Sequence, residues 1–302
     1  MNEATPQRVN QSVKQREYHM TESNSWTRIG EVAPADLSSA TLELHWASQF
    51  IAAAGQSFVE PREDDSHRSM TWQAARREFV GESFADAYPF RVGLRPADLT
   101  LQLLDRTEQP LGSLPLAGKT IEDGYEWLMT GLANYMERLP EILRPDFALP
   151  SHPVQKGARF SENQQHEFTT LSALYESAAT LLGEVVDGHD TASEVRCWPH
   201  HFDIATLVTV EQGEDAESAK TIGIGMAPTG SDAGGWYWYV TPWPYPDPAD
   251  LPTLDGAGAW HTEGWVGAVL SGEEVVQAEA ALREAMVRKF IDASVGAALS
   301  LL

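Results

Sequence analysis

Four prolines fall within fourteen residues at the middle of this 302-residue chain: Pro140, Pro145, Pro150 and Pro153. Proline fixes its own φ angle and lacks a backbone N–H, so such a cluster cannot continue a helix and stiffens a connection. Periodic apolar segments lie on both sides of it. The cluster therefore predicts a boundary between an N-terminal half, 35–150, and a C-terminal half, 151–302.

Both halves show the same order of hydrophobic patterns. In the first half the apolar residues recur at helical spacing, then alternate as in strands, then recur at helical spacing again, over 42–53, 70–103 and 121–139. Within this half, alternation over 90–104 predicts a hairpin, and Thr120 with Asp123 resembles a capping box at the start of a helix. The second half repeats this order over 168–185, 194–243 and 273–299. The pattern predicts an α+β fold with antiparallel sheets flanked by helices. Either the two halves have similar structures, or they are unrelated and only share the same order of helices and strands.

The first 34 residues differ from the rest because they are polar and contain no apolar signal-peptide region. We expect residues 1–34 to form a disordered tail and the protein to be a soluble, cytoplasmic one. No window of about 18 apolar residues occurs that could cross a membrane.

Charge and cysteine content exclude several classes of partner. The 44 acidic residues outnumber the 21 basic ones, which gives a formal net charge of -23. Such a surface repels phosphate backbones and anionic lipids, so we expect neither nucleic acid nor membrane as a partner. The single cysteine, Cys197, excludes a disulfide framework and a multi-cysteine metal site.

The stretch WPHHFD at 198–203 carries the candidate catalytic residues, His200, His201 and Asp203. His201 and Asp203 are two residues apart, so they would share one face of a strand, while His200 would face the other way. A carboxylate bonded to an imidazole fixes its tautomer and raises its basicity, as in a general base or half of a metal site. The alternative is a buried His–Asp hydrogen bond that only stabilises the strand.

A second segment, 235–244, contains four consecutive aromatic residues. In a strand, Trp236 and Trp238 would point to one face, and Tyr237 and Tyr239 to the other. Such a pattern is typical of a strand buried on both faces, or of a platform for a flat ligand. The polar loop that follows, 245–265, has the length of a lid or binding loop.

These segments resemble a bacterial family of uncharacterised proteins. The matching strings are WPHHFD at 198–203, GMAP at 225–228 and YVTPW at 239–243, and the stretch 42–49 is similar to a front motif. The resemblance covers roughly 35–140 and 160–300. It implies relatedness and transfers no activity.

Two functions from different classes fit these observations. The first is a protein with an aromatic and histidine-lined cleft for a small molecule. Its candidate ligand-binding residues are His45, Trp198, Trp236, Tyr237, Trp238 and Tyr239. The second is a hydrolytic or metal-assisted enzyme built on His201 and Asp203. Its candidate metal ligands are His200, His201 and His261. The sequence names no cofactor, substrate or oligomeric state, and clustering of the histidines in space would favour the enzyme.

Overall fold

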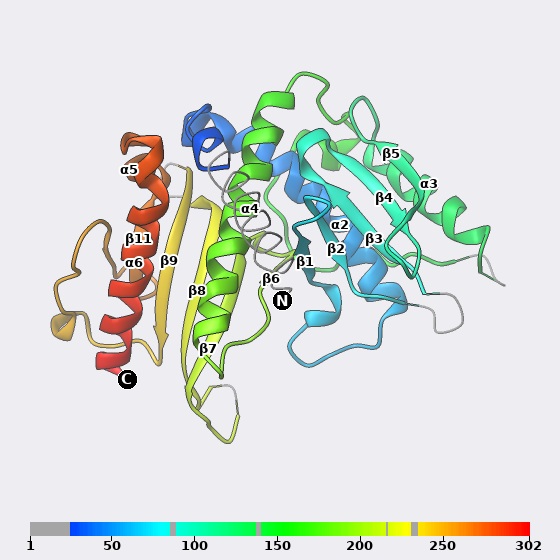
Figure 1. Cartoon of the computed structure of the whole chain (residues 1–302). Helices are drawn as coiled ribbons and strands as arrows, with labels where there is room; N and C mark the ends of the chain where they lie inside the picture. Colours follow the sequence, from blue (N-terminus) through cyan, green and yellow to red (C-terminus); the bar gives the residue numbers. More distant parts are fainter. Residues whose placement is uncertain (1–24, 85–88, 137–139, 216, 231–234) are drawn as a thin grey trace, which may run out of the picture.

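The computed structural model describes residues 25–84, 89–136, 140–215, 217–230 and 235–302. It has the predicted α+β fold: the described strands form one eleven-stranded, open, antiparallel sheet (Figure 1). The first half contributes β1 (Met70–Gln73), β2 (Glu78–Gly81), β3 (Arg91–Arg95), β4 (Thr100–Leu104) and β5 (Pro110–Pro115). The second half contributes β6 (Arg196–Cys197), β7 (Ile204–Glu211), β8 (Lys220–Gly230), β9 (Gly235–Trp243), β10 (Ala259–His261) and β11 (Gly267–Ser271).

The sheet order is β10-β11-β9-β8-β7-β6-β1-β2-β3-β4-β5, so each half supplies one uninterrupted block of strands. The blocks meet where β1 pairs with β6, with Met70 opposite Cys197. The first strand of each half therefore forms the centre of the sheet. The two halves share one continuous hydrophobic core across this junction. Similarity between the backbones of the halves stays a prediction.

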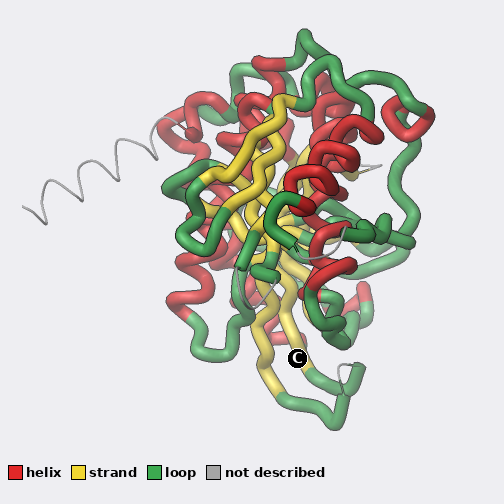
Figure 2. The backbone as a smooth tube through the Cα atoms, turned by 90° about the vertical axis from the view of Figure 1, so that its right-hand side faces the viewer, coloured by secondary structure: helices red, strands yellow, loops and turns green. Residues whose placement is uncertain are grey.

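The described α-helices are α2 (Ser38–Phe58), α3 (Ile121–Ala133), α4 (Gln165–Gly188), α5 (Gly272–Gln277) and α6 (Ala280–Leu301). They pack on one side of the sheet, which we call the covered face; it carries Phe79, Leu94, Ile224 and Trp238. The Phe79 ring contacts Tyr175 of α4 edge-on, with the ring centroids 4.8 Å apart. Because the sheet twists, helices appear on both sides of the strands in Figure 2.

The opposite side of the sheet, which we call the open face, carries a row of residues in register across the central strands. This row is Thr71, Arg196, Ala205, Gly225 and Tyr239. Side chains alternate between the two faces of a strand, so each residue of the row has neighbours in sequence that point into the core.

Local signals explain where two helices begin and end. Thr120 caps α3 as predicted: its hydroxyl accepts from the Asp123 N–H at 3.1 Å, and the Asp123 carboxylate accepts from the Thr120 N–H at 2.8 Å. The single helix predicted over 273–299 is wrong, because the chain is extended at Ala278 between α5 and α6. There the Arg283 guanidinium donates to the carbonyls of Val276 and Ala278.

Part of the predicted tail belongs to the fold. Trp26 and Ile29 are buried in the core, and Arg283 donates to the Trp26 carbonyl at 3.0 Å. The prediction of a disordered tail is therefore wrong for 25–34, because the three-residue spacing of its apolar side chains lets them pack together against the core. Residues 1–24 lie outside the described residues. No helix in the described part of the chain is long and apolar enough to cross a membrane.

Candidate functional site

The WPHHFD stretch forms a turn, which corrects the prediction of a strand running through it. β6 ends at Cys197 and β7 begins at Ile204. Between them the Trp198 N–H donates to the Asp203 carbonyl at 2.9 Å, and the Phe202 N–H donates to the Trp198 carbonyl at 2.6 Å. Phe202 has a φ of 61°, in the left-handed region that non-glycine residues rarely adopt. The alternation rule for strands therefore does not apply to His200 and His201.

Two helices hold this turn from the covered face. His45 and Gln49 of α2 both donate to the Pro199 carbonyl, at 2.8 and 2.9 Å. The Tyr175 hydroxyl of α4 donates to the Phe202 carbonyl at 2.6 Å. The His45 ring also stacks on the Phe202 ring, with their centroids 5.1 Å apart. The backbone of the turn is thus fixed by three side-chain donors.

His45, a candidate ligand-binding residue, is consequently a core residue. It is 5% exposed, and burial lowers its pKa to about 4, although the bond to Pro199 opposes this shift. The imidazole is neutral at physiological pH, and its Nε2 carries the proton donated to Pro199.

The candidate catalytic residues have different surroundings. His201 is exposed and His200 is half-buried, with their ring centroids 4.4 Å apart. In the described residues no hydrogen bond joins His201 to Asp203. The Asp203 carboxylate instead accepts from the Tyr239 hydroxyl at 2.6 Å, across the open face. The structure thus brings the three residues close together, but in a different arrangement from the predicted His–Asp pair.

Burial raises the pKa of Asp203, while the Tyr239 bond and the two nearby histidines, His201 and His200, partly oppose the shift. Burial and the Asp203 charge together hold the pKa of Tyr239 well above its usual value. The phenol therefore stays protonated and serves as a donor to the carboxylate.

Strand β9 separates the aromatic candidates into two groups. Trp236 and Trp238 point to the covered face and are almost completely buried, so they offer no surface to a ligand. Tyr237 and Tyr239 point to the open face and are half-buried. Trp265 lies edge-on to Tyr239 there, with the ring centroids 6.4 Å apart.

The three candidate metal ligands do not come together. His261 lies on the edge strand β10, where its ring packs against Trp265 with the centroids 4.6 Å apart. Its Nε2 donates to the Glu263 carbonyl at 2.8 Å. Within the described ranges, no group of three or more His, Cys, Asp or Glu side chains could hold a metal ion.

A cavity of about 180 Å³ lies beside the turn. Its lining consists of Asp65, Arg68, Phe147, Trp198, Pro199 and His200. The Phe147 and Trp198 rings both approach His200 edge-on, at centroid distances of 6.0 and 6.2 Å. Sequence reasoning missed Asp65, Arg68 and Phe147, because they come from irregular segments without a periodic pattern.

A more polar cavity of about 350 Å³ lies next to the junction of the halves. Glu82 at its edge accepts from Arg62 at 3.1 Å and from Arg196 at 3.0 Å. Arg196 also pairs with Glu194 at 2.7 Å, so two guanidiniums meet two carboxylates. The network is best explained as a link between β6 and the N-terminal half.

No family model, no curated protein and no solved structure matches this chain. The resemblance to a bacterial family of uncharacterised proteins thus stays a prediction. Fold and site define a helix-covered antiparallel sheet with a rigid, histidine-bearing turn at its centre.

Proposed function

We propose that the protein binds a small planar molecule in the cavity beside the 198–203 turn. One observation carries the proposal. Trp198 and His200 line the cavity, and the backbone between them is held from the other side by the hydrogen bonds of His45 and Gln49 to Pro199.

The rigidity of the turn supports a binding role. A left-handed non-glycine residue such as Phe202 costs on the order of 1–3 kcal/mol, and such strain persists only where the surroundings enforce it. Strain of this kind concentrates at ligand sites. A preformed site also loses less conformational entropy when a ligand binds.

The lining determines the chemistry of the ligand. Phe147 and Trp198 contribute aromatic rings to the lining, which suits a flat molecule. The Arg68 guanidinium lies over the Phe147 ring at 5.4 Å and is held by Asp65 at 2.7 Å. Burial lowers the pKa of His200, so its neutral ring provides one donor and one acceptor at physiological pH.

The size of the cavity limits the ligand further. About 180 Å³ is below the roughly 300–1,000 Å³ typical of sites for drug-sized ligands. We therefore propose a ligand of one or two fused rings with a hydrogen-bonding edge.

The alternative is a hydrolytic enzyme built on His201 and Asp203. It is favoured by the raised pKa of Asp203, a buried carboxyl within electrostatic reach of two imidazoles. Against it, Asp203 bonds to Tyr239, and no described residue forms a hydrogen bond that would orient the exposed His201 ring as a base. Ligand binding therefore accounts for more of the geometry.

Titration of the full chain with indole, benzamide and benzamidine, followed by amide NMR shifts, tests the proposal. We expect at least one probe to shift the signals of Trp198 and His200. Trp198→Ala should lower the affinity for that probe at least tenfold. The control Trp243→Ala removes an exposed tryptophan from the far end of β9 and should leave the affinity unchanged. Equal affinity in the two variants, or shifts confined to other regions, would contradict the proposal.

A further inference from the structure

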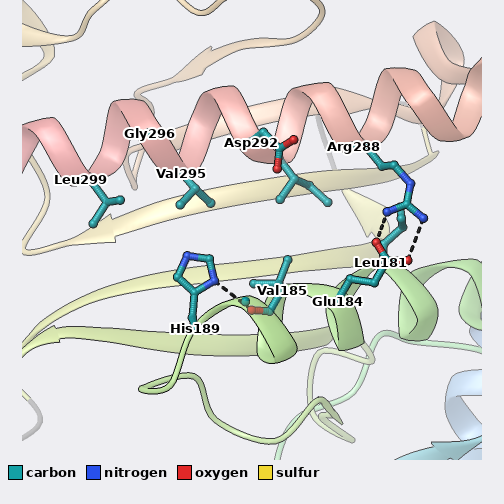
Figure 3. Close-up of a pocket in the computed structure, with 11 residues that line it drawn as sticks. Leu181, Glu184, Val185, His189, Arg288, Asp292, Val295, Gly296 and Leu299 are labelled. Carbon is teal, nitrogen blue, oxygen red and sulfur yellow. Dashed lines mark hydrogen bonds and ion pairs between the residues drawn. The ribbon is translucent and has the colours of Figure 1, made fainter.

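The helices α4 and α6 enclose a second cavity, which is larger than the one at the turn. Figure 3 shows their facing sides, with Leu181, Val185 and His189 on and just after α4, opposite Arg288, Val295 and Leu299 on α6. The volume is about 560 Å³, within the range of small-molecule sites. We call it the α4–α6 groove.

The lining of the groove combines apolar side chains with positions that carry no side chain. Its apolar lining residues are Leu181, Val185, Ile291, Val295 and Leu299. Two further lining residues are glycines, Gly188 and Gly296, and a Cβ atom added at either would meet no atom within 4 Å. The apolar walls thus face unfilled space, as in a site for an aliphatic chain.

An ion pair bridges the two helices at one end of the groove. The Arg288 guanidinium forms a forked pair with the Glu184 carboxylate, at 2.8 Å for one of the two contacts. It also donates to the Glu284 carboxylate at 2.9 Å. Because Arg288 is shared by two carboxylates, the only cation among the described lining residues is already neutralised.

The remaining polar groups of the groove are acceptors. Asp292 is exposed on α6, and no hydrogen bond or ion pair engages its carboxylate in the described structure. The His189 Nδ1 donates to the Val185 carbonyl at 2.9 Å, so a neutral ring would keep Nε2 as an acceptor. Asp292 lies between Arg288 and Val295 along α6 (Figure 3), and its carboxylate attracts a cationic donor and repels an anionic head group.

We infer that the α4–α6 groove binds a primary alkylamine in its ammonium form. The ammonium group meets the Asp292 carboxylate, and the alkyl chain lies along Val185, Val295 and Leu299. None of these residues belongs to the turn at 198–203, so this inference is independent of the proposed planar ligand and fails or holds separately from it.

Calorimetric titration of the full-length protein with octylamine, octanol and octanoate at neutral pH distinguishes the contribution of the ligand's head group from that of its alkyl chain. We expect octylamine to bind at least tenfold more tightly than octanoate, with octanol between them. From hexylamine to decylamine the affinity should rise about two- to fourfold for each added methylene. Equal binding of amine and carboxylate, or no dependence on chain length, would overturn the inference.

Gly296→Leu adds a side chain whose Cβ atom meets no other atom within 4 Å, and it improves helix propensity, so we expect the variant to fold. The Gly296→Leu variant should bind each of the three probes more than tenfold more weakly than the wild type. Asp292→Asn should remove the preference for the amine and leave octanol binding unchanged. The control Asp187→Asn neutralises an exposed acid of α4 outside the groove and should change nothing.

Undiminished binding by Gly296→Leu would place the amine elsewhere and overturn the inference. A preference for the amine that survives in Asp292→Asn would overturn the role of Asp292. Sedimentation of the wild type and Gly296→Leu tests the other occupant: dissociation of a dimer in the variant would identify a second copy of the chain in the groove, and would also overturn the inference.

Discussion

The two faces of strand β9 carry the same kind of side chain in opposite environments. On the covered face Trp236 and Trp238 are fully buried, and their indole N–H groups have no hydrogen-bond partner in the described structure. On the open face the Tyr239 hydroxyl is bonded to Asp203 at 2.6 Å. Neighbouring aromatic residues thus serve packing on one face and polar positioning on the other.

This difference follows from what covers each face. An unpaired buried N–H costs about 1–3 kcal/mol, so apolar packing against the helices must offset that cost for each tryptophan. Tyr239 points to the open face and can bond its hydroxyl to the Asp203 carboxylate. Aromatic content alone therefore does not identify a ligand platform, and the covering layer decides the role.

The largest expected difference between the faces is in stability. Trp238→Ala should lower the free energy of unfolding by about 4 kcal/mol, because it leaves a cavity in a closely packed core. Tyr237→Ala, next to it on the open face, should cost less than about 1 kcal/mol. Denaturant unfolding of both variants measures the two losses of unfolding free energy. Equal losses would mean that the open face is as closely packed as the covered one.

Acid should destabilise the covered face through His45. Its pKa is about 4 in the folded protein and about 6.5 when unfolded, so the unfolded chain binds more protons between these values. The contribution of His45 is complete above pH 6.5 and falls by about 3 kcal/mol as the pH drops through 4. His45→Gln keeps a donor for Pro199.

Unfolding free energies measured from pH 7 to pH 4 test this effect. The slope attributable to His45 should be absent from His45→Gln, although the lost stacking on Phe202 should lower the variant's stability at every pH. A wild-type slope that persists unchanged in the variant would assign the acid sensitivity to other groups.

The fold class could be predicted because periodicity is a local property. Alternation at 90–104 predicted the hairpin of β3 and β4, and the capping box at Thr120 predicted the start of α3. The joining of both halves in one sheet could not be predicted. It depends on the short pairing of Met70 with Cys197, whose strand β6 is too short for a periodic pattern.

The candidate site was predicted less completely for a related reason. The WPHHFD residues were identified by composition, but their directions depend on the left-handed Phe202 and on donors from α2 and α4. Such long-range hydrogen bonds leave no trace in local spacing. Asp203 was therefore paired with the wrong side chain, since Tyr239 reaches it from a strand 36 residues further along the chain.

A smaller effect is expected on the open face at Gly225. A Cβ atom there would lie 2.6 Å from the Tyr239 ring and 2.8 Å from the Ile204 carbonyl. Gly225→Ala should therefore displace Tyr239 from Asp203 and cost about 2 kcal/mol. Gly183→Ala, at a helical glycine where an added Cβ has open space, is the control and should be neutral or stabilising.

The smallest effect is expected at Asp203. Its contribution to stability changes with pH in the direction opposite to that of His45 on the covered face. The pKa of Asp203 is raised by burial, so between its usual value and the raised one the folded state binds more protons than the unfolded state. Its contribution therefore becomes less favourable as the pH rises through this window, opposite to that of His45. Asp203→Asn keeps an acceptor for the Tyr239 hydroxyl and removes the buried charge.

At pH 7 Asp203→Asn should be as stable as the wild type or more stable, within about 1 kcal/mol, and the two should converge towards pH 4 and below. Tyr239→Phe is the matched comparison, because it leaves the Asp203 carboxylate without its donor and should cost about 1–3 kcal/mol at pH 7. Thermal unfolding of the three proteins across this range measures both. If Asp203→Asn lost as much stability at pH 7 as Tyr239→Phe, the charge itself would stabilise the fold, and the two faces would not differ in the sign of their response to acid.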